Sequence, residues 1–530
     1  MKKENIWQKA AQNFIWDKPY KKISQAPKTG PKKWFVAGKL NYTKTIFEKN
    51  FALGNALKEA VVFYKSPFQK KSYTYASLLN QTNSLASYLE QKGINKKSRV
   101  LILTGSKKEQ VFLILALLRL GIQFGVLYSK FPPTLINILI HKSKATHIIS
   151  NKKLAKSIRA GKASFIKLDN VPQKKAAPVI RPGSVSSDFS CFLSFSSGTT
   201  GEKPKIFLNG TAGCLIGMDY ITQAATFNGL KDDYILNTLN FTFGNYPIIA
   251  GLIMPLNRGG KIIFLDFNYR LNDKSIMKIL EKEGVEMVIS SPPFFEIPQN
   301  KYSSPKIKNV LIAGQKVSLT VLDLIIKTFP GACLINIVGS QEASAYLIRS
   351  FSNKNSKNLI NVLKPLLGLE YKIIKKEIFI KDTWPCLAPP LNNKRSYLKR
   401  WRGRFFGTGD LVKKTKLGLE IVGRSDRLTK YRGRQINLEY LENILESQPF
   451  VHKAKCLIVH NKSRSELAVF LSLKQEHQNF SLSQLKNLIK KIVDARFGSY
   501  AKLSKIVFVK EFPTSASGKV MEKILLKKYA

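Results

Sequence analysis

The strongest constraint on the fold is an alternation of short apolar runs with amphipathic segments. Residues 99–105 (RVLILTG) form an apolar run of strand length, residues 107–121 have helical periodicity, and residues 123–129 form a second run. Strand–helix–strand spacing of this kind predicts a parallel sheet with helices on both faces. The same unit returns over residues 261–291 and 309–339. We therefore expect an α/β protein whose large N-terminal part contains layered, mostly parallel sheets with flanking helices.

The chain is too long for a single hydrophobic core. At about 100–200 residues for each domain, its 530 residues predict three or four packing units. After Gly423 the pattern changes: two short strands precede an amphipathic helix at residues 482–493, and a further strand and helix follow. We predict an N-terminal domain of several subdomains over residues 1–425, and a small, mobile α+β domain over residues 426–530.

Lysine dominates the charge of this chain. Lys and Arg number 87 against 34 Asp and Glu, which gives a net charge of +53, and arginine supplies only 17 of the 87. A nucleic-acid-binding module would explain such a charge, but it predicts basic residues gathered with aromatic residues on one face. The lysines are instead spread from Lys2 to Lys528, while eight arginines fall between Arg395 and Arg434. We expect no nucleic-acid partner.

Cysteine usage and hydropathy bear on the compartment. The five cysteines are scattered without a CxxC pair, and the five histidines add no metal-spaced set. The first residues lack the continuous apolar core of a secretory signal, and no apolar run approaches the ~20 residues that cross a bilayer. We expect a cytoplasmic protein without a transmembrane segment.

One loop has a composition that suits phosphate binding. Residues 193–205 (LSFSSGTTGEKPK) combine five hydroxyl side chains with Gly198, Gly201 and two lysines. Hydroxyls, backbone amides freed by glycine and cations are the groups that bind a polyphosphate. The lysine spacing differs from GxxxxGK[ST], and a flexible polar turn has the same composition. Taken alone, the loop leaves both interpretations open.

This loop resembles the phosphate-binding signature of adenylate-forming enzymes, and four further segments resemble other motifs of the same family. IVGSQEAS (337–344) resembles YGxTE, and FFGTGDL (405–411) resembles YxTGDL. GRSDRLTKYRGRQI (423–436) resembles GRxDxxIKxxGxRI, and PTSASGKV (513–520) resembles PxTxSGKxxR. All five stand in the order of that family, so a chance match to the set is remote.

Within the family, the likeness is to acetyl-CoA synthetase and its short- and medium-chain relatives. Residues 33–50 and 382–410 resemble segments of those enzymes, so the resemblance covers nearly the whole chain. It implies the adenylate-forming fold and a two-step reaction. A carboxylate attacks the α-phosphate of ATP, pyrophosphate leaves, and a thiol then takes the acyl group from the acyl-adenylate. The implied cofactors are ATP, Mg²⁺ and coenzyme A, and the implied partner is a small-molecule carboxylic acid.

The resemblance also implies roles for individual residues. Lys519 would be the catalytic cation between the carboxylate and the α-phosphate, Glu342 would act in catalysis as the metal ligand that holds Mg²⁺, and Asp426 would be the hinge. Asp410 would accept hydrogen bonds from the ribose hydroxyls, with Arg424 assisting. The full ATP- and phosphate-binding set is Ser196, Ser197, Gly198, Thr199, Thr200, Gly201, Lys205, Gly314, Gln315, Asp410 and Arg424. The acyl pocket would contain Val338, Gly339 and Gly244.

Departures from the family pattern bear on the acid and on turnover. Gly339 stands where acetyl-CoA synthetases have an indole, so we predict an acid larger than acetate. Gly244 stands where amino-acid-activating domains have an aspartate, which argues against an amino acid. The other departures are Val338, Gln341 and Gln435, which replace an aromatic residue, threonine and arginine, and an extra residue at Glu202-Lys203. Two alternatives remain: a degenerate member with weak activity, and a ligase that loads the phosphopantetheine of an acyl carrier protein.

Overall fold

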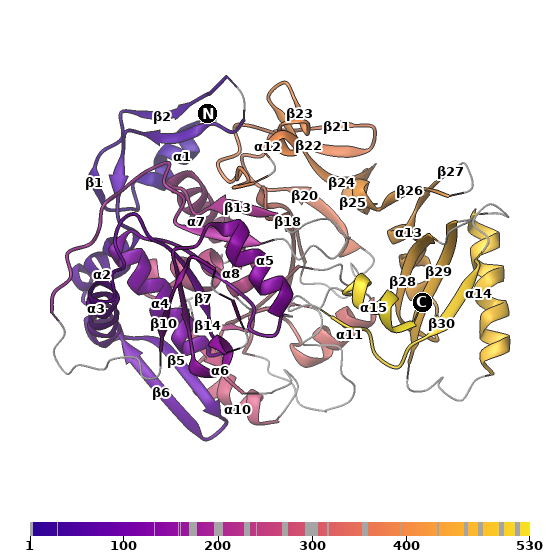
Figure 1. Ribbon diagram of the computed structural model, residues 1–530, viewed down its shortest axis with the longest axis horizontal. Coiled ribbons are helices and arrows are strands. Elements are labelled where there is room, and N and C mark those ends of the chain that lie inside the picture. Colours follow the sequence, from indigo (N-terminus) through magenta and orange to yellow (C-terminus); the bar gives the residue numbers. More distant parts are fainter. Residues whose placement is uncertain are drawn as a thin grey trace. The chain divides into compact units, whose positions relative to one another are not determined.

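The structure, a computed structural model, divides the chain into two compact units (Figure 1). The large unit extends to Glu370 and includes Ile380–Phe406, and the small unit comprises Tyr371–Phe379 and Gly407–Ala530. The predicted domain boundary between residues 425 and 426 stays a prediction. The residues that the structure describes are 4–28, 30–131, 133–156, 158–159, 161–168, 178–195, 205–226, 234–239, 241–267, 274–291, 306–314, 317, 319–351, 359–392, 394–431, 434–460, 465–474, 481–497, 503–514 and 520–529.

A six-stranded sheet contains the first alternation of the large unit. Its order is β10-β9-β7-β8-β12-β13, and all strands are parallel except β13. The strands are β7 (Arg99–Leu103), β8 (Gln123–Val126), β9 (His147–Ser150), β10 (Ser164–Lys167), β12 (Phe192–Phe195) and β13 (Ile206–Asn209). The predicted helix between β7 and β8 is α4 (Lys107–Leu120). Ser106 caps it by accepting the Glu109 N–H, and Gly121 ends it with a φ of +69°.

A second sheet of the large unit has the order β20-β19-β18-β17-β16-β14-β15-β5-β6. The run from β5 to β18 is parallel, and β6, β19 and β20 are antiparallel to their neighbours. The strands are β5 (Glu59–Ser66), β6 (Gln69–Thr74), β14 (Tyr234–Asn237), β15 (Lys261–Leu265), β16 (Met287–Ser290), β17 (Asn309–Ala313), β18 (Cys333–Ser340), β19 (Ser344–Phe351) and β20 (Val362–Pro365).

Helices of the large unit bury their apolar faces against this framework. They include α3 (Tyr75–Gln91), α5 (Pro133–Ser143), α7 (Ala212–Thr226), α10 (Lys274–Lys282) and α11 (Leu319–Thr328). Ile276 and Leu280 of α10 and Leu322 of α11 form one buried cluster with Leu236 and Val310 of the sheet. This burial is the main stabilising contribution to the unit, because removing apolar surface from water contributes about 25 cal/mol per Å². The predicted α/β class with mostly parallel sheets is confirmed.

The small unit has its own sheet, helices and core. β24 (Phe405–Thr415) pairs antiparallel with β25 (Gly418–Arg424), and β26 (Leu428–Tyr431) pairs with β27 (Arg434–Asn437). A three-stranded sheet of β28 (Val451–His460), β29 (Ser465–Leu473) and β30 (Lys505–Phe508) follows. The helices α13 (Leu438–Glu446), α14 (Leu482–Phe497) and α15 (Glu522–Tyr529) complete the α+β arrangement. Leu441, Val469 and Ile489 lie in its fully buried core.

All five cysteines are free thiols. Cys191, Cys214, Cys386 and Cys456 are buried, and Cys333 is half-buried. Burial raises the pKa of the thiols of Cys191, Cys333, Cys386 and Cys456. None of the described helices has the length and apolar character that crossing a membrane requires.

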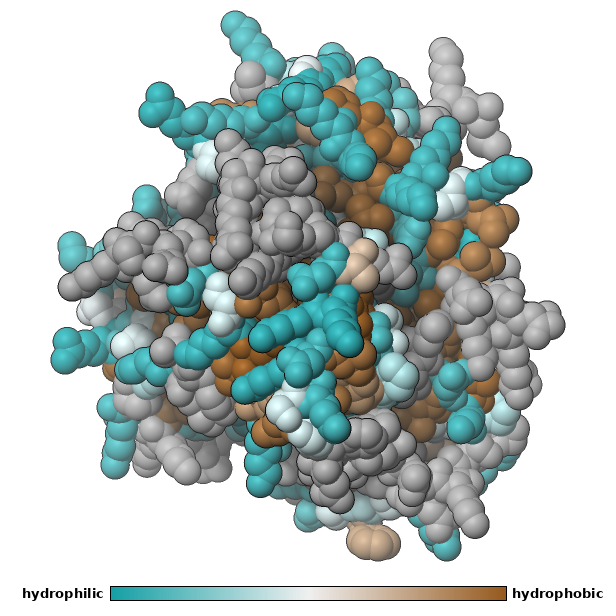
Figure 2. All heavy atoms as spheres, turned by 90° about the vertical axis from the view of Figure 1, so that its right-hand side faces the viewer, coloured by the Kyte–Doolittle hydropathy of each residue, from teal (hydrophilic) through white to brown (hydrophobic). Residues whose placement is uncertain are grey.

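On the face drawn in Figure 2, hydrophilic side chains project at many places, with hydrophobic side chains between them. This agrees with the even spread of lysine along the sequence.

Candidate active site

The carboxyl ends of two neighbouring parallel strands lead to predicted site residues. β17 is followed by Gly314, whose φ of +94° favours glycine, and Val338 and Gly339 lie near the end of β18. Because Ala313 of β17 pairs with Ile337 of β18, Gly314 lies at the same edge as Val338. Ligands of open α/β sheets bind at this edge, outside the carboxyl ends of the strands.

Glu342 stands in the turn that joins β18 to β19. Its side chain is 13% exposed, and its Oε1 accepts a hydrogen bond from Arg400 Nη1 at 2.8 Å. Its carbonyl oxygen accepts the Ala388 N–H at 2.7 Å, which fixes the main chain of the turn. The Arg400 guanidinium also lies 4.5 Å from the centre of the Phe406 ring. The carboxylate is therefore held by a cation that is itself positioned by an aromatic ring.

Asn209, the last residue of β13, links this turn to the strand that leads into the predicted phosphate loop. Its side chain is almost fully buried, and its Nδ2 donates to Ser194 Oγ at 2.5 Å and to the Gln341 carbonyl oxygen at 3.1 Å. Ser194 belongs to β12, whose last residue, Phe195, directly precedes Ser196. Because an unpaired buried polar group is costly, these bonds hold the two segments in one arrangement.

Two glycines of the predicted acyl pocket have close neighbours. Gly244 has a φ of +92°, and a Cβ there would lie 1.9 Å from Gln341 Oε1, so the Gln341 side chain lies directly against this glycine. A Cβ at Gly339 would lie 2.1 Å from the Ser344 carbonyl oxygen. The place where a side chain would begin at position 339 is therefore occupied by the main chain of the hairpin, and is not open space.

In the small unit, the two residues predicted to bind ribose lie side by side. Asp410 of β24 and Arg424 of β25 are partners in register, and Asp410 Oδ1 accepts a hydrogen bond from Arg424 Nη1 at 3.0 Å. The Asp410 side chain is 8% exposed. The Thr408 hydroxyl accepts the Asp410 N–H at 3.1 Å and donates to the Ile378 carbonyl oxygen at 2.9 Å. The carboxylate is thus held rigidly, with a cation beside it.

Other predicted site residues lie outside the described part of the chain. They are Ser196, Ser197, Gly198, Thr199, Thr200, Gly201, Gln315 and Lys519. For Asp426 the structure gives the main chain, in the short turn Ser425–Arg427. Lys205 directly precedes β13. The roles of all these residues stay predictions.

Two residues with contacts at this site were missed by the sequence motifs. Arg400 falls in the arginine-rich stretch 395–434, so the clustering indicated the region but not the partner, Glu342. Asn209 has no sequence signal, because its contacts join residues 15 and 132 positions apart.

Two family models match the chain. The model described as AMP-binding enzyme matches residues 49–378, and the model described as AMP-binding enzyme C-terminal domain matches residues 440–519. The first match alone covers more than half of the chain.

Individual proteins match over almost the full length. The acetyl-coenzyme A synthetase of Pyrobaculum arsenaticum is 23% identical over 603 aligned residues, which cover 98% of this chain and 88% of the relative. Acetyl-coenzyme A synthetase 1 of Candida albicans is 22% identical, with 99% of this chain and 87% of the relative covered. ATP-bound MatB from Rhodopseudomonas palustris has the same fold, with a TM-score of 0.76 at 16% identity over 92% of this chain and 98% of that chain.

Proposed function

Because this chain belongs to the family of AMP-binding enzymes, we propose that it activates a carboxylic acid with ATP and passes the acyl group to coenzyme A. The family and the adenylate-forming fold that the motifs predicted are confirmed. The class is that of AMP-forming ligases of acids and thiols, which use ATP, Mg²⁺ and coenzyme A.

The observation that carries the proposal is the pair of hydrogen bonds made by Asn209. They place the strand that leads into the phosphate loop beside the turn that contains Glu342. A nucleoside triphosphate needs these two elements together, since the loop would bind phosphate oxygens and Glu342 would hold a metal ion that offsets their charge.

In the proposed first step, a carboxylate oxygen of the acid attacks the α-phosphorus of ATP and pyrophosphate leaves. The protein contributes position and charge, with Lys519 placed between the two anionic reactants. Asp410 accepts hydrogen bonds from the ribose hydroxyls, and the hydrogen bond from Arg424 orients that carboxylate. In the second step the thiol sulfur attacks the acyl carbon, AMP leaves with the bonding electrons, and the thiol proton is released to water. Asp426 is the proposed hinge between the two poses.

The chemistry of Glu342 fits a magnesium ion. Mg²⁺ is bound in such sites by one or two carboxylates, substrate phosphates and waters, so a single carboxylate at this turn is a sufficient protein contribution. The ion would neutralise phosphate charge. A magnesium ion at Glu342 would share the carboxylate with the guanidinium of Arg400.

We propose an acid larger than acetate. The support is the absence of an indole at position 339 of the sequence. Main chain occupies the place next to Gly339 and the Gln341 side chain occupies the place next to Gly244, so added room at Gly244 would require Gln341 to move. The proposed acceptor is coenzyme A, with a carrier phosphopantetheine as an outcome of the test, and the proposed compartment is the cytoplasm.

The proposal is tested by pyrophosphate release from ATP with a panel of acids, with and without coenzyme A. We expect release with an acid longer than acetate, and a steady rate only when coenzyme A is present. Lys519→Ala should lower the rate by about 10²–10³-fold, as the loss of a transition-state cation does. Lys523→Ala, an exposed lysine four residues further along, is the matched control and should leave the rate unchanged.

Three outcomes contradict parts of the proposal. Acetate as the best acid would remove the size argument. Acyl-adenylate formation without consumption of coenzyme A would favour a carrier protein as acceptor. The absence of pyrophosphate release with every acid would indicate a degenerate member of the family.

A further inference from the structure

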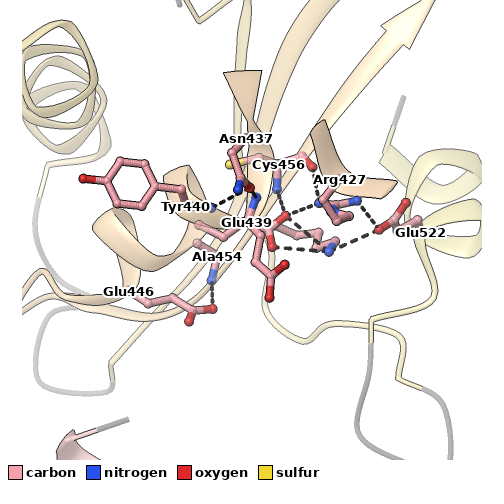
Figure 3. A network of polar contacts seen from close by, with 10 residues as sticks. Arg427, Asn437, Glu439, Tyr440, Glu446, Ala454, Cys456 and Glu522 are labelled. Carbon is pink, nitrogen blue, oxygen red and sulfur yellow. Dashed lines mark hydrogen bonds and ion pairs between the residues drawn. The ribbon is translucent and has the colours of Figure 1, made fainter. Parts of the chain in front are cut away.

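A partly buried network of charges lies within the small unit, centred on Arg427 (Figure 3). Arg427 Nη1 donates to Glu522 Oε1 at 2.7 Å, and Nη2 donates to Glu442 Oε1 at 2.5 Å and to the Cys456 carbonyl oxygen at 3.0 Å. The guanidinium thus makes three hydrogen bonds to three separate segments: α13, β28 and α15.

Lys455 closes the network. Its Nζ lies 3.2 Å from Glu442 Oε1 and 3.1 Å from Glu522 Oε1, so each carboxylate faces both cations. The four side chains are only 10–15% exposed. Burial by itself would lower the pKa of Arg427, but the carboxylates of Glu442 and Glu522 outweigh it and raise the pKa. The network therefore pairs two basic side chains with two acidic ones.

The network ties together the two segments on which the proposed chemistry depends. Arg427 follows the proposed hinge residue Asp426 in the chain, and Glu522 is the first residue of α15, three positions after Lys519. The sequence pattern that contains Lys519 ends in arginine where this chain has Glu522, so the sign of the charge is inverted there. In this chain the opposite charge is supplied by Arg427.

The residues on either side of Lys519 are fixed on the same framework. Thr514 and Val520 form an antiparallel bridge, and the Met521 N–H donates to the Pro513 carbonyl oxygen at 2.7 Å. Val520 is buried in a cluster with Phe470 and Leu525.

We propose that Arg427 is a positioning residue for the adenylation step, acting through Glu522 on the segment that contains Lys519. This inference rests on the proposed function. Replacing a buried ion pair by apolar side chains is often neutral for stability, so a network of this kind is better explained by the geometry that it specifies. Its geometry fixes the start of α15 relative to the residue that follows the proposed hinge, so that α15 would move together with Arg427 in a rotation about Asp426.

The test separates the two half-reactions. Adenylation is followed as pyrophosphate release, and thioester formation is followed from added acyl-adenylate and coenzyme A, a step that does not use the lysine in this mechanism. Glu522→Gln should slow adenylation by roughly 10–100-fold, the effect of a displacement near 1 Å. Glu522→Gln should change the rate of thioester formation less than about twofold. The control Lys523→Ala should change neither the adenylation rate nor the rate of thioester formation.

Further variants keep the inference testable if Glu522→Gln is poorly folded. Arg427→Lys keeps the positive charge but lacks the planar fork, whose two nitrogens bond three segments, and it should slow adenylation selectively. The double variant Arg427→Lys with Glu522→Gln should be no slower than the worse single variant, because both residues act through one contact.

Two results would overturn the positioning role. One is equal slowing of both half-reactions together with a lower melting temperature, which indicates a structural role alone. The other is adenylation by Glu522→Gln and Arg427→Lys at the rate of the Lys523→Ala control. If the unmodified protein releases no pyrophosphate with any acid, the proposed function fails and the inference fails with it, a result distinct from both.

Discussion

Gly339 has main chain where a side chain would begin. Its Cβ would lie 2.1 Å from the Ser344 carbonyl oxygen, closer than any real contact, and Ser344 itself has a φ of +54°. A main-chain atom cannot move aside as the end of a flexible side chain can. In this chain the hairpin that presents Glu342 therefore leaves no room for a side chain at position 339.

Gly339→Ala should consequently lower stability by about 1–3 kcal/mol, the usual effect of overpacking. It should also slow pyrophosphate release, because the turn that contains Glu342 must shift. Thermal unfolding and initial rates measure the two effects. Gly105→Ala is the matched control, since its Cβ would lie 3.6 Å from Ser129 Oγ, an ordinary contact. Equal behaviour of the two variants would contradict this account of the hairpin.

Among the elements of the small unit, the start of α13 combines a good cap with an unfavourable charge. The Asn437 side chain accepts the N–H groups of Glu439 and Tyr440. Burial and then the Glu442 carboxylate raise the pKa of Glu439, although Arg427 and Arg424 act in the opposite direction. A carboxyl whose pKa is raised by folding favours the folded state most when protonated, below its unfolded pKa. That contribution is lost as the pH rises through the folded pKa.

Glu439→Gln should therefore raise the melting temperature at pH 7.5, because above the unfolded pKa of glutamate the raised pKa of Glu439 in the folded protein costs stability that a glutamine does not. The advantage should shrink as the pH falls and disappear near pH 4, about the unfolded pKa of glutamate. Glu511→Gln is the matched control in the same unit, because Glu511 is exposed and should show no such difference. A melting temperature that is lower at both pH values would contradict the expected sign.

The strands and helices of the large unit were largely predictable, because each is defined by a local pattern. The strand expected from Arg99 became β7, and the helix expected over residues 107–121 became α4, bounded by Ser106 and Gly121. The motif that contains Asp410 and the motif that contains Arg424 lie on paired strands, so their proximity follows from a short hairpin.

Contacts between distant segments were not predictable from the sequence. Asn209 and Arg400 obtain their partners only when two sheets and a connecting segment have packed. The same holds for Arg427, whose partner Glu522 is 95 positions away. No local periodicity specifies such pairs, since they depend on tertiary geometry rather than on the residue types of neighbours in the chain.

At the scale of the whole molecule, the charge of +53 divides into two kinds. Lysine is spread over the surface, as the hydrophilic side chains of Figure 2 are. The arginines of residues 395–434 are different, because several pair with acids inside the fold. These ion pairs are Arg400–Glu342, Arg404–Asp382, Arg424–Asp410 and Arg427–Glu442. Part of the arginine cluster therefore serves internal geometry.

The small unit contains enough core to predict an independent fold for residues 426–530. Its two apolar clusters, from Ile436 to Leu525, lie wholly within that range, as does the Arg427 network. We expect this fragment to unfold cooperatively by circular dichroism and to give a dispersed amide NMR spectrum. A fragment without a cooperative transition would contradict the predicted boundary.

The burial of the thiols would make the proposed rotation of the small unit measurable by fluorescence. Maleimide dyes react with the thiolate, and burial raises the pKa of four of the cysteines, including the half-buried Cys333. A cysteine introduced at an exposed position, such as Lys523, would therefore take up dye well before the native thiols. A second cysteine at exposed Phe68 in the large unit would complete a donor–acceptor pair. The two proposed poses could then be tested in single molecules, with ATP or with the thiol, without removing any native cysteine.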